Sequence, residues 1–353
     1  KKTRGNKSRF AESGSKTLQI DVSATLRWTI TRRSTPAVGA AGYPIAVSPP
    51  FAKLCVSAPL RQNLMQTMCI ACPSQAAIGL FITEVSTYIP ADSVRSTKIQ
   101  SEFRRERMLL QDKVVVVTGG ANGIGRALCR RFADEGAAAV VVTDIDEAAA
   151  LKLADEIGGI GIGIGCDVGS EADVQKVVTR TVEEFGRIDL FCSNAGITVN
   201  GGLETTDAEW ERMWQVNVLS RVYAARAVLP AMLARGSGYF LQTVSAAGLL
   251  TEIGSASYSV TKHADLAYAE WLSSIYGREG IGISCICPLG VETDMLDPND
   301  PIHQFLQVAA ITPEQVADSV VEGLNDEQFL ILPHPEVAEF FQMKADDHDR
   351  WLR

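Results

Sequence analysis

VVVVTGGANGIG, residues Val114–Gly125, joins an apolar run of β-branched residues to a glycine-rich turn. The run predicts a buried strand, and the apolar spacing of Gly123–Gly136 predicts a helix that begins inside the turn. Gly119 allows a tight turn, Gly123 lets the backbone approach a phosphate, and Gly125 lets helix and strand pack closely. Strand, glycine turn and helix in this order are typical of a pyrophosphate site at a helix N-terminus. An ordinary glycine turn is the alternative interpretation.

Strand and helix patterns alternate from this unit to residue 332. Strands are predicted at Val114–Thr118, Ala139–Thr143, Ile160–Cys166, Ile188–Ser193, Gly238–Val244, Ile281–Cys287 and Phe329–Leu332. Helices are predicted at Gly123–Gly136, Glu147–Ile157, Glu171–Phe185, Asp207–Ala234, Ser257–Tyr276 and Pro313–Gly323. This alternation predicts an α/β fold with one doubly wound parallel sheet that carries helices on both faces. Ligands of such a sheet bind beyond the carboxyl ends of its strands.

Charge divides the 353-residue chain near residue 107. Residues 1–107 hold 16 lysines and arginines against 6 acidic residues, whereas residues 108–353 hold 17 against 36. The first part shows no sustained helical or strand period. We therefore expect an N-terminal extension at 1–107, either disordered or not part of the native protein, and one nucleotide-binding domain at 108–353. Met108 just before the first strand favours the second of these readings, and an Arg- and Ser-rich targeting peptide is a third.

Composition excludes several classes of protein. The acidic second part argues against a nucleic-acid surface, because neutralising phosphates needs clustered lysines and arginines. No apolar run reaches the ~18 residues that a membrane span needs. The eight cysteines have no spacing typical of a disulfide framework, which favours a reducing compartment, and we expect the cytoplasm. Cys69 and Cys72 form a lone pair without a second pair or a histidine cluster, so we expect no metal site.

Acidic residues follow the second and third predicted strands. Asp144 stands 19 residues after Gly125, where a carboxylate that binds ribose hydroxyls is expected. A carboxylate here would repel a 2′-phosphate, and Asp146 adds to the repulsion, so NAD is favoured over NADP. An N-cap of the following helix is the alternative role, and Asp146 could cap while Asp144 binds ribose. Asp167 is expected near the adenine, although it also fits a simple turn.

Polar residues with catalytic potential gather in the second half of the domain. Tyr258 and Lys262 are four residues apart on a predicted helix, so they share one face. A nearby ammonium favours a phenolate and lowers the phenol pKa, which suits a general acid/base. Alone, this pair would be better explained by chance on a solvated face. Ser245 ends the fifth strand, however, where its hydroxyl can meet Tyr258 at one carbonyl oxygen. Asn217, an amide among apolar residues inside a helix, needs hydrogen-bond partners and predicts a kink held by water.

Together these features resemble the short-chain dehydrogenase/reductase family over residues 111–332. The resemblance implies a seven-stranded Rossmann-like sheet and two sets of site residues. The catalytic residues that it implies are Asn217, Ser245, Tyr258 and Lys262. The cofactor-binding residues that it implies are Gly119, Asn122, Gly123, Ile124, Gly125, Asp144, Asp167, Val168, Asn194, Ala195, Gly196, Tyr258, Lys262, Pro288, Val291 and Thr293.

The resemblance also implies what these residues do. Tyr258 would be the general acid/base, and Ser245 would polarise the carbonyl. Lys262 would hold the nicotinamide ribose and tune Tyr258, and Asn217 would order a water in a proton relay. Thr293 would contact the nicotinamide carboxamide.

Two features depart from the family pattern. Leu289 stands where the family usually has glycine, which puts the local backbone path and the substrate wall in doubt. The acidic segment Glu336–Arg353 replaces the usual C-terminal tail. A dimer through the two long helices is still expected, and a homotetramer is the other possibility.

We therefore expect an NAD-dependent oxidoreductase that interconverts a secondary alcohol and a ketone. Lids are expected at Thr293–Ile311 and near Thr198–Leu203. An apolar alcohol or ketone is the expected small-molecule substrate, because apolar residues occur where the pocket wall should lie: Leu249, Leu250, Met295, Leu296 and Phe305. One alternative is an NADPH-dependent 3-oxoacyl thioester or carbonyl reductase, against which Asp144 argues. Another is an NAD(H)-binding sensor without turnover, against which the complete catalytic set argues.

Overall fold

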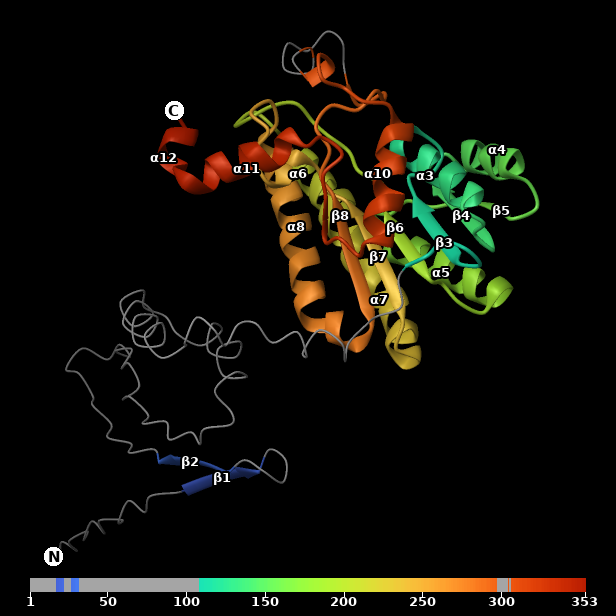
Figure 1. Cartoon of the computed structure of the whole chain (residues 1–353), viewed down its shortest axis with the longest axis horizontal. Helices are drawn as coiled ribbons and strands as arrows, with labels where there is room; N and C mark the ends of the chain where they lie inside the picture. The colour runs from blue at the N-terminus through green and yellow to red at the C-terminus, as the bar shows by residue number, and fades with distance from the viewer. Residues whose placement is uncertain (1–16, 22–26, 32–107, 297–303, 305) are drawn as a thin grey trace, which may run out of the picture. The chain divides into compact units, whose positions relative to one another are not determined.

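A computed structural model of the chain describes residues 17–21, 27–31, 108–296, 304 and 306–353. The chain divides into two units, Lys1–Ser96 and Thr97–Arg353. In the first unit, β1 (Thr17–Asp21) pairs antiparallel with β2 (Arg27–Thr31) (Figure 1). The sequence did not predict these strands, because five residues are too few to establish a period. Cys69 and Cys72 lie outside the described residues.

The second unit is built on a parallel sheet of seven strands, as the sequence predicts. Its strands are β3 (Val114–Thr118), β4 (Ala139–Asp144), β5 (Gly161–Gly165), β6 (Leu190–Ser193), β7 (Gly238–Thr243), β8 (Ile281–Ile286) and β9 (Leu330–Ile331). They lie in the order β5-β4-β3-β6-β7-β8-β9. The chain thus winds outward from β3 to β5, returns to β6 on the other side of β3, and winds outward again. This reversal opens a crevice beyond the carboxyl ends of β3 and β6.

Helices cover both faces of the sheet (Figure 1). One face carries α3 (Gly123–Asp134), α4 (Glu147–Ile157) and α10 (Pro313–Asn325), and the other carries α5 (Glu171–Phe185), α7 (Ser220–Arg235) and α8 (Ala256–Tyr276). Successive side chains of each strand point to opposite faces of the sheet, so a strand such as β3 contributes to both hydrophobic clusters. Val116 of β3 packs with one cluster, and its neighbours Val115 and Val117 pack with the other.

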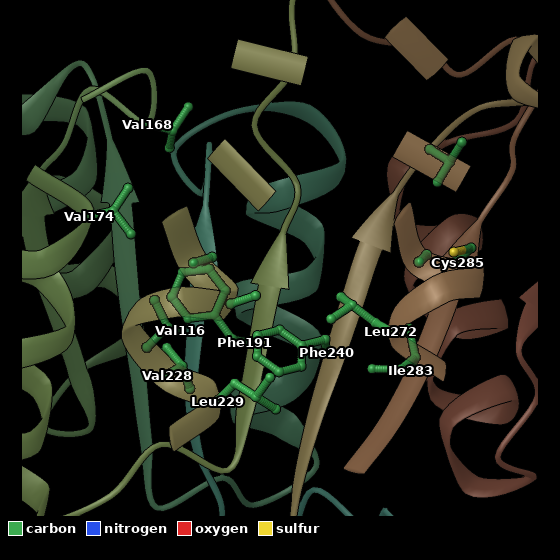
Figure 2. Packing of buried hydrophobic residues seen from close by; sticks show 14 of the residues in the cluster. Val116, Val168, Val174, Phe191, Val228, Leu229, Phe240, Leu272, Ile283 and Cys285 are labelled. Carbon is green, nitrogen blue, oxygen red and sulfur yellow. The ribbon is translucent and has the colours of Figure 1, made fainter. Parts of the chain in front are cut away.

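Figure 2 shows the cluster under α5, α7 and α8, where Phe191 of β6 lies beside Phe240 of β7. The two ring centroids are 6.4 Å apart. Both side chains are almost fully buried, and burying a phenylalanine contributes about 1.5–3 kcal/mol to stability. The central strands are therefore held from both faces, which fixes the strand ends that form the crevice.

The helix predicted at Asp207–Ala234 is not regular. It consists of α6 (Asp207–Trp214), a π-helical turn η3 (Gln215–Leu219) and α7. The extra residue in a π turn changes which side chains face inward, and Asn217 in the middle of η3 is fully buried. The helix is thus interrupted at Asn217 by a π turn, which the sequence did not specify.

Two further helices follow β9, α11 (Glu336–Asp346) and α12 (His348–Trp351). Neither was predicted, because the apolar residues of this acidic segment do not repeat with a clear period. Within the described part of the chain, no helix is both long and apolar enough to cross a membrane.

Candidate active site

A cleft of about 410 Å³ lies beyond the carboxyl ends of the strands. The predicted site residues that line it are Gly119, Asn122, Gly123, Ile124, Asp144, Asp167, Val168, Asn194, Ala195, Gly196, Ser245, Tyr258, Lys262, Pro288, Val291 and Thr293. Two predicted residues, Gly125 and Asn217, do not line the cleft but lie behind its wall. The fold thus brings together residues from segments more than 170 positions apart.

The glycine turn has the geometry of an anion cradle at the start of α3. Gly119 and Gly123 have φ of +60° and +49°, the left-handed region that favours glycine. A Cβ at Gly123 would lie 2.9 Å from Cγ2 of Thr293, so a side chain there would fill the cleft. A Cβ at Gly125 would meet the Gly119 carbonyl oxygen and the Asn194 amide, so the helix needs glycine to pack closely.

The start of α3 is also electrostatically suited to a diphosphate. Within this described helix, no acidic residue stands in the first turn, and the side chain of the N-cap Asn122 makes no capping hydrogen bond. The first amides therefore keep their hydrogen-bonding capacity, and the helix dipole favours an anion here. The residues present fit the pyrophosphate of a dinucleotide.

Two aspartates, Asp144 at the end of β4 and Asp146 just after it, have different roles. Asp146 caps α4, because its side chain accepts a hydrogen bond from the amide of Ala149 at 3.0 Å. Asp144 does not cap α4. Its carboxylate accepts from the amide of Ala121 at 3.1 Å and from that of Asp146 at 3.2 Å. These bonds hold Asp144 at the edge of the cleft beside the glycine turn, as a ribose ligand requires.

At the neighbouring strand end, Asp167 lines the cleft with an unpredicted partner, Arg212 of α6. Both guanidinium nitrogens Nη1 and Nη2 lie 3.2 Å from the carboxylate. Burial alone would raise the pKa of Asp167, but the hydrogen bonds from Arg212 and the Gly169 amide hold it below its usual value. Arg212 also lines the cleft. It lies 45 residues further along the chain, so no local pattern could reveal it.

Asn194 ties three strand ends together at the floor of the cleft. Its Nδ2 donates to the carbonyl oxygens of Thr118 and Gly119, each at 3.0 Å. Its Oδ1 accepts from the hydroxyl of Thr243 at 3.0 Å. The small residues Ala195 and Gly196 follow and leave the cleft open above them.

Tyr258, Lys262 and Ser245 meet on the opposite wall. Ser245 lies close enough to the Tyr258 phenol to lower its pKa, and Lys262 Nζ lies 5.6 Å from the centre of the Tyr258 ring. Lys262 is almost fully buried, and its Nζ donates to the Thr243 carbonyl at 2.8 Å. Ser255 caps α8 by accepting from the Tyr258 amide at 3.1 Å, which fixes the first turn that carries the phenol.

Burial dominates the protonation of this pair. It raises the pKa of Tyr258 to about 12, although Ser245 lowers it. It lowers the pKa of Lys262 to about 8, and Arg221 lowers it further while Asp265 raises it. The phenol pKa is therefore raised, not lowered as expected, because desolvation of the phenolate outweighs the positive charge of Arg221 and the contribution of Ser245.

The side-chain amide of Asn217 forms hydrogen bonds with the backbone of the cleft wall. Its Nδ2 donates to the Ile197 carbonyl at 2.9 Å and to the Thr261 hydroxyl at 3.1 Å, and its Oδ1 accepts from the Ile197 amide at 3.0 Å. Ile197 itself lines the cleft. Protein groups thus bind the amide, and the amide fixes the segment that follows Gly196.

The segment after β8 closes the cleft from the other side. Leu289 lines the cleft, and its amide donates to Nδ1 of His334 at 3.2 Å. His334 comes from the C-terminal part, 45 residues further along the chain, and is buried against this turn. The Leu289 position is therefore an ordered part of the wall. A Cβ at Gly290 would meet the backbone of Leu306, which explains the glycine that remains.

The predicted apolar pocket is found in part. Met295 and Leu296 line the cleft, together with Leu289, Ile197 and Val216. The predictions for Leu249 and Leu250 are wrong, because both are buried in the hydrophobic cluster under α8 and do not line the cleft. Phe305 and residues 297–303 of the expected lid lie outside the described residues. Of the second expected lid, Thr198–Leu203, no residue lines the cleft.

Comparison with known proteins identifies this arrangement. The sequence pattern of short chain dehydrogenases matches residues 113–302. A protein named CLA biosynthesis dehydrogenase/reductase, from Lactiplantibacillus plantarum, is 33% identical over 256 residues, 64% of this chain and 89% of that protein. The 1-deoxy-11-beta-hydroxypentalenate dehydrogenase of Streptomyces exfoliatus is 32% identical over 247 residues, 68% of this chain and 90% of that protein.

A solved structure gives the same answer. A short-chain dehydrogenase/reductase from Burkholderia phymatum, crystallised with NAD, superposes with a TM-score of 0.64 at 28% identity. The match covers 69% of this chain and 96% of the other. The pattern match extends over more than half of the chain, and it contains the glycine turn, the Tyr258 and Lys262 pair and the cleft between them. The chain therefore belongs to the short-chain dehydrogenase/reductase family of oxidoreductases, which bind a nicotinamide cofactor.

Proposed function

We propose that this chain is an NAD-dependent dehydrogenase that interconverts a secondary alcohol and a ketone. The observation that carries the proposal is that Ser245, Tyr258 and Lys262 line one cleft, where Ser245 lies close enough to the phenol of Tyr258 to lower its pKa. Two hydroxyls side by side can bind one carbonyl or alcohol oxygen, and a phenol can pass a proton to or from it. Bound NAD would supply the acceptor or donor of the hydride.

Different residues around the cleft would bind different parts of the cofactor. The amides at the start of α3 would hold the pyrophosphate, and Asp144 the adenosine ribose. Lys262 would hold the nicotinamide ribose, and Thr293 the carboxamide. The preference for NAD rests on the ribose end, where Asp144 is followed by the exposed Ile145 and then by Asp146. Arg126, the first cation after the turn, is already paired with Glu156 at 3.1 Å.

The protein groups move one proton per turnover. Tyr258 has a pKa of about 12, so it carries its proton at neutral pH and can donate it to a carbonyl oxygen as the ketone is reduced. In the reverse direction the phenolate form of Tyr258 accepts the alcohol proton. Ser245 would orient the oxygen for both directions. The apolar side chains of Leu289, Met295 and Leu296 favour a lipophilic substrate over a sugar.

We further propose that the chain works as a homodimer or homotetramer in the cytoplasm. Trp271 and Ile275 of α8 are about half exposed, and apolar side chains on a long helix favour contact with a second copy. The five cysteines of the described residues are all free and buried, which agrees with a reducing compartment. Light scattering of the purified chain tests the assembly.

Titration with NADH and NADPH, followed by nucleotide fluorescence, tests the cofactor. Clear preference for NADH is the expected result, and preference for NADPH would overturn the assignment of Asp144. Secondary alcohols of increasing size are then offered with NAD⁺, and formation of NADH is followed by absorbance. If NADH binds but no alcohol or ketone is turned over, a role in sensing NAD(H) replaces the enzymatic one.

A further inference from the structure

Behind Lys262 the domain buries an ion pair between two helices. Arg221 on α7 and Asp265 on α8 have side chains that are 1% and 0% exposed, and Arg221 Nε lies 3.2 Å from Asp265 Oδ2. The same carboxylate oxygen lies 3.8 Å from Nζ of Lys262. One buried carboxylate is thus shared by two cations, one of which belongs to the cleft.

Arg221 also holds the backbone that forms the cleft wall. Its Nη1 donates to the carbonyl oxygens of Ala195 and Val216 and contacts the hydroxyl of Ser220, each at 2.8 Å. Ala195 and Val216 line the cleft, and Val216 lies in the π turn η3. The planar guanidinium presents several donors in a fixed fork, so one arginine can bind these acceptors and the carboxylate together.

We propose that Arg221 and Asp265 form a positioning pair for the reaction, in which Asp265 retains the Lys262 ammonium at the cleft and Arg221 balances Asp265 while it fixes the Ala195 carbonyl. The inference rests on the proposed function, since that function gives Lys262 the task of holding the nicotinamide ribose. Neither residue touches the cleft, so both act through Lys262 and the backbone.

The charged and titratable groups that face Lys262 come from three elements. They are Tyr258 and Asp265 on α8, Arg221 on α7 and Cys287 after β8. Tyr258 and Cys287 both have pKa values of about 12, so they keep their protons in the range where Lys262, with a pKa of about 8, loses its own. Burial raises the pKa of Asp265, although Arg221 and Lys262 both favour its charged form.

The two members of the pair therefore act on Lys262 with opposite sign. Asp265 stabilises the ammonium and Arg221 destabilises it. Removing the negative charge should make Lys262 lose its proton at lower pH, and removing the positive charge should make it keep the proton to higher pH. A residue that served only packing would not show this reversal.

The experiment measures NADH affinity of the full chain by fluorescence between about pH 6.5 and pH 10.5. Affinity of the wild type is expected to fall as pH rises through about 8, because the ammonium that holds the ribose is lost. In Asp265→Asn, which keeps the shape, the midpoint of this fall should move to lower pH. In Arg221→Met it should move to higher pH, with shifts of about 1–3 units typical for a charge at this range.

Arg221→Lys is the matched control, because it keeps the positive charge but loses the planar set of guanidinium donors. Its midpoint should stay near the wild-type value, while its affinity for NADH is lower at every pH. If a single variant fails to fold, the pair Arg221→Met with Asp265→Leu replaces the ions by apolar side chains, a change that proteins often tolerate. Its midpoint should return close to that of the wild type.

The outcomes separate this inference from the proposed function. Wild-type chain that binds no NADH at any pH overturns the proposed function, and the inference with it. Wild-type chain that binds NADH, with both single variants shifted in the same direction or not at all, overturns only the positioning pair. An affinity for NADH that does not change across the pH range does the same.

Discussion

At the residue scale, the proposed reaction depends on a half-buried phenol beside a buried amine. Desolvation favours the neutral form of each, so the pKa of Tyr258 rises to about 12 while that of Lys262 falls to about 8. We expect Tyr258→Phe to lower kcat by about 10²–10⁴-fold, since it removes the proton donor alone. NADH affinity, measured by fluorescence, should stay near the wild-type value. Turnover that survives this change would assign the proton to another group.

The burial of Lys262 also predicts how stability depends on pH. Its pKa is about 8 in the fold against 10.5 in a free lysine, so between these values the unfolded chain holds a proton that the folded chain lacks. Stability should therefore rise with pH across this window, by at most about 3 kcal/mol for this group. Urea unfolding at pH 7.5 and pH 10 compares the wild type with Lys262→Met. The rise should be smaller in the variant, and equal rises in both chains would contradict the prediction.

At the element scale, the start of α3 is shaped by glycine. In Gly123→Ala, the added Cβ meets Cγ2 of Thr293 at 2.9 Å and the residue must adopt a φ of +49°. We expect a loss of about 1 kcal/mol of stability, from the strained backbone, and at least a tenfold loss of NADH affinity. The matched control is Gly159→Ala, because a Cβ there meets nothing within 4 Å. Equal NADH affinity in Gly123→Ala and in the control would show that the cradle does not hold the pyrophosphate.

Elements set by local pattern were predictable, and those set by distant contacts were not. The bounds of β3, α4 and α5 follow from β-branched runs, capping residues and amphipathic spacing, and they match the structure residue for residue. The π turn η3 could not be predicted, because it is held by distant residues, such as Thr261 on α8, which binds Asn217. Arg221 and Asp265 did leave a signal. Each is a charge on a predicted helix, one turn after a candidate site residue, Asn217 or Lys262.

At the scale of the whole molecule, the order of the strands brings the site together. β3 and β6 are neighbours although 72 residues separate Thr118 from Leu190, and each carries site residues at its carboxyl end. β7 and β8 add Ser245 and Pro288 on the same edge. The sequence predicts each of these residues at the carboxyl end of a strand. Because the strands are parallel, these ends lie at the same edge of the sheet, so the residues are close together. Partners from distant segments, such as Arg212 on α6 with Asp167 after β5, depend on the finished packing.

The same topology predicts which part of the chain is sufficient for nucleotide binding. Among the described residues, all those that line the cleft lie between Gly119 and Leu296, inside the unit Thr97–Arg353. Both hydrophobic clusters of the described residues also begin no earlier than Met108. We therefore expect a chain that starts at Thr97 to unfold with the same midpoint in urea as the full chain and to bind NADH with the same affinity. A lower midpoint with unchanged affinity would mean that residues 1–96 stabilise the fold, whereas a loss of affinity alone would mean that they contribute to the site.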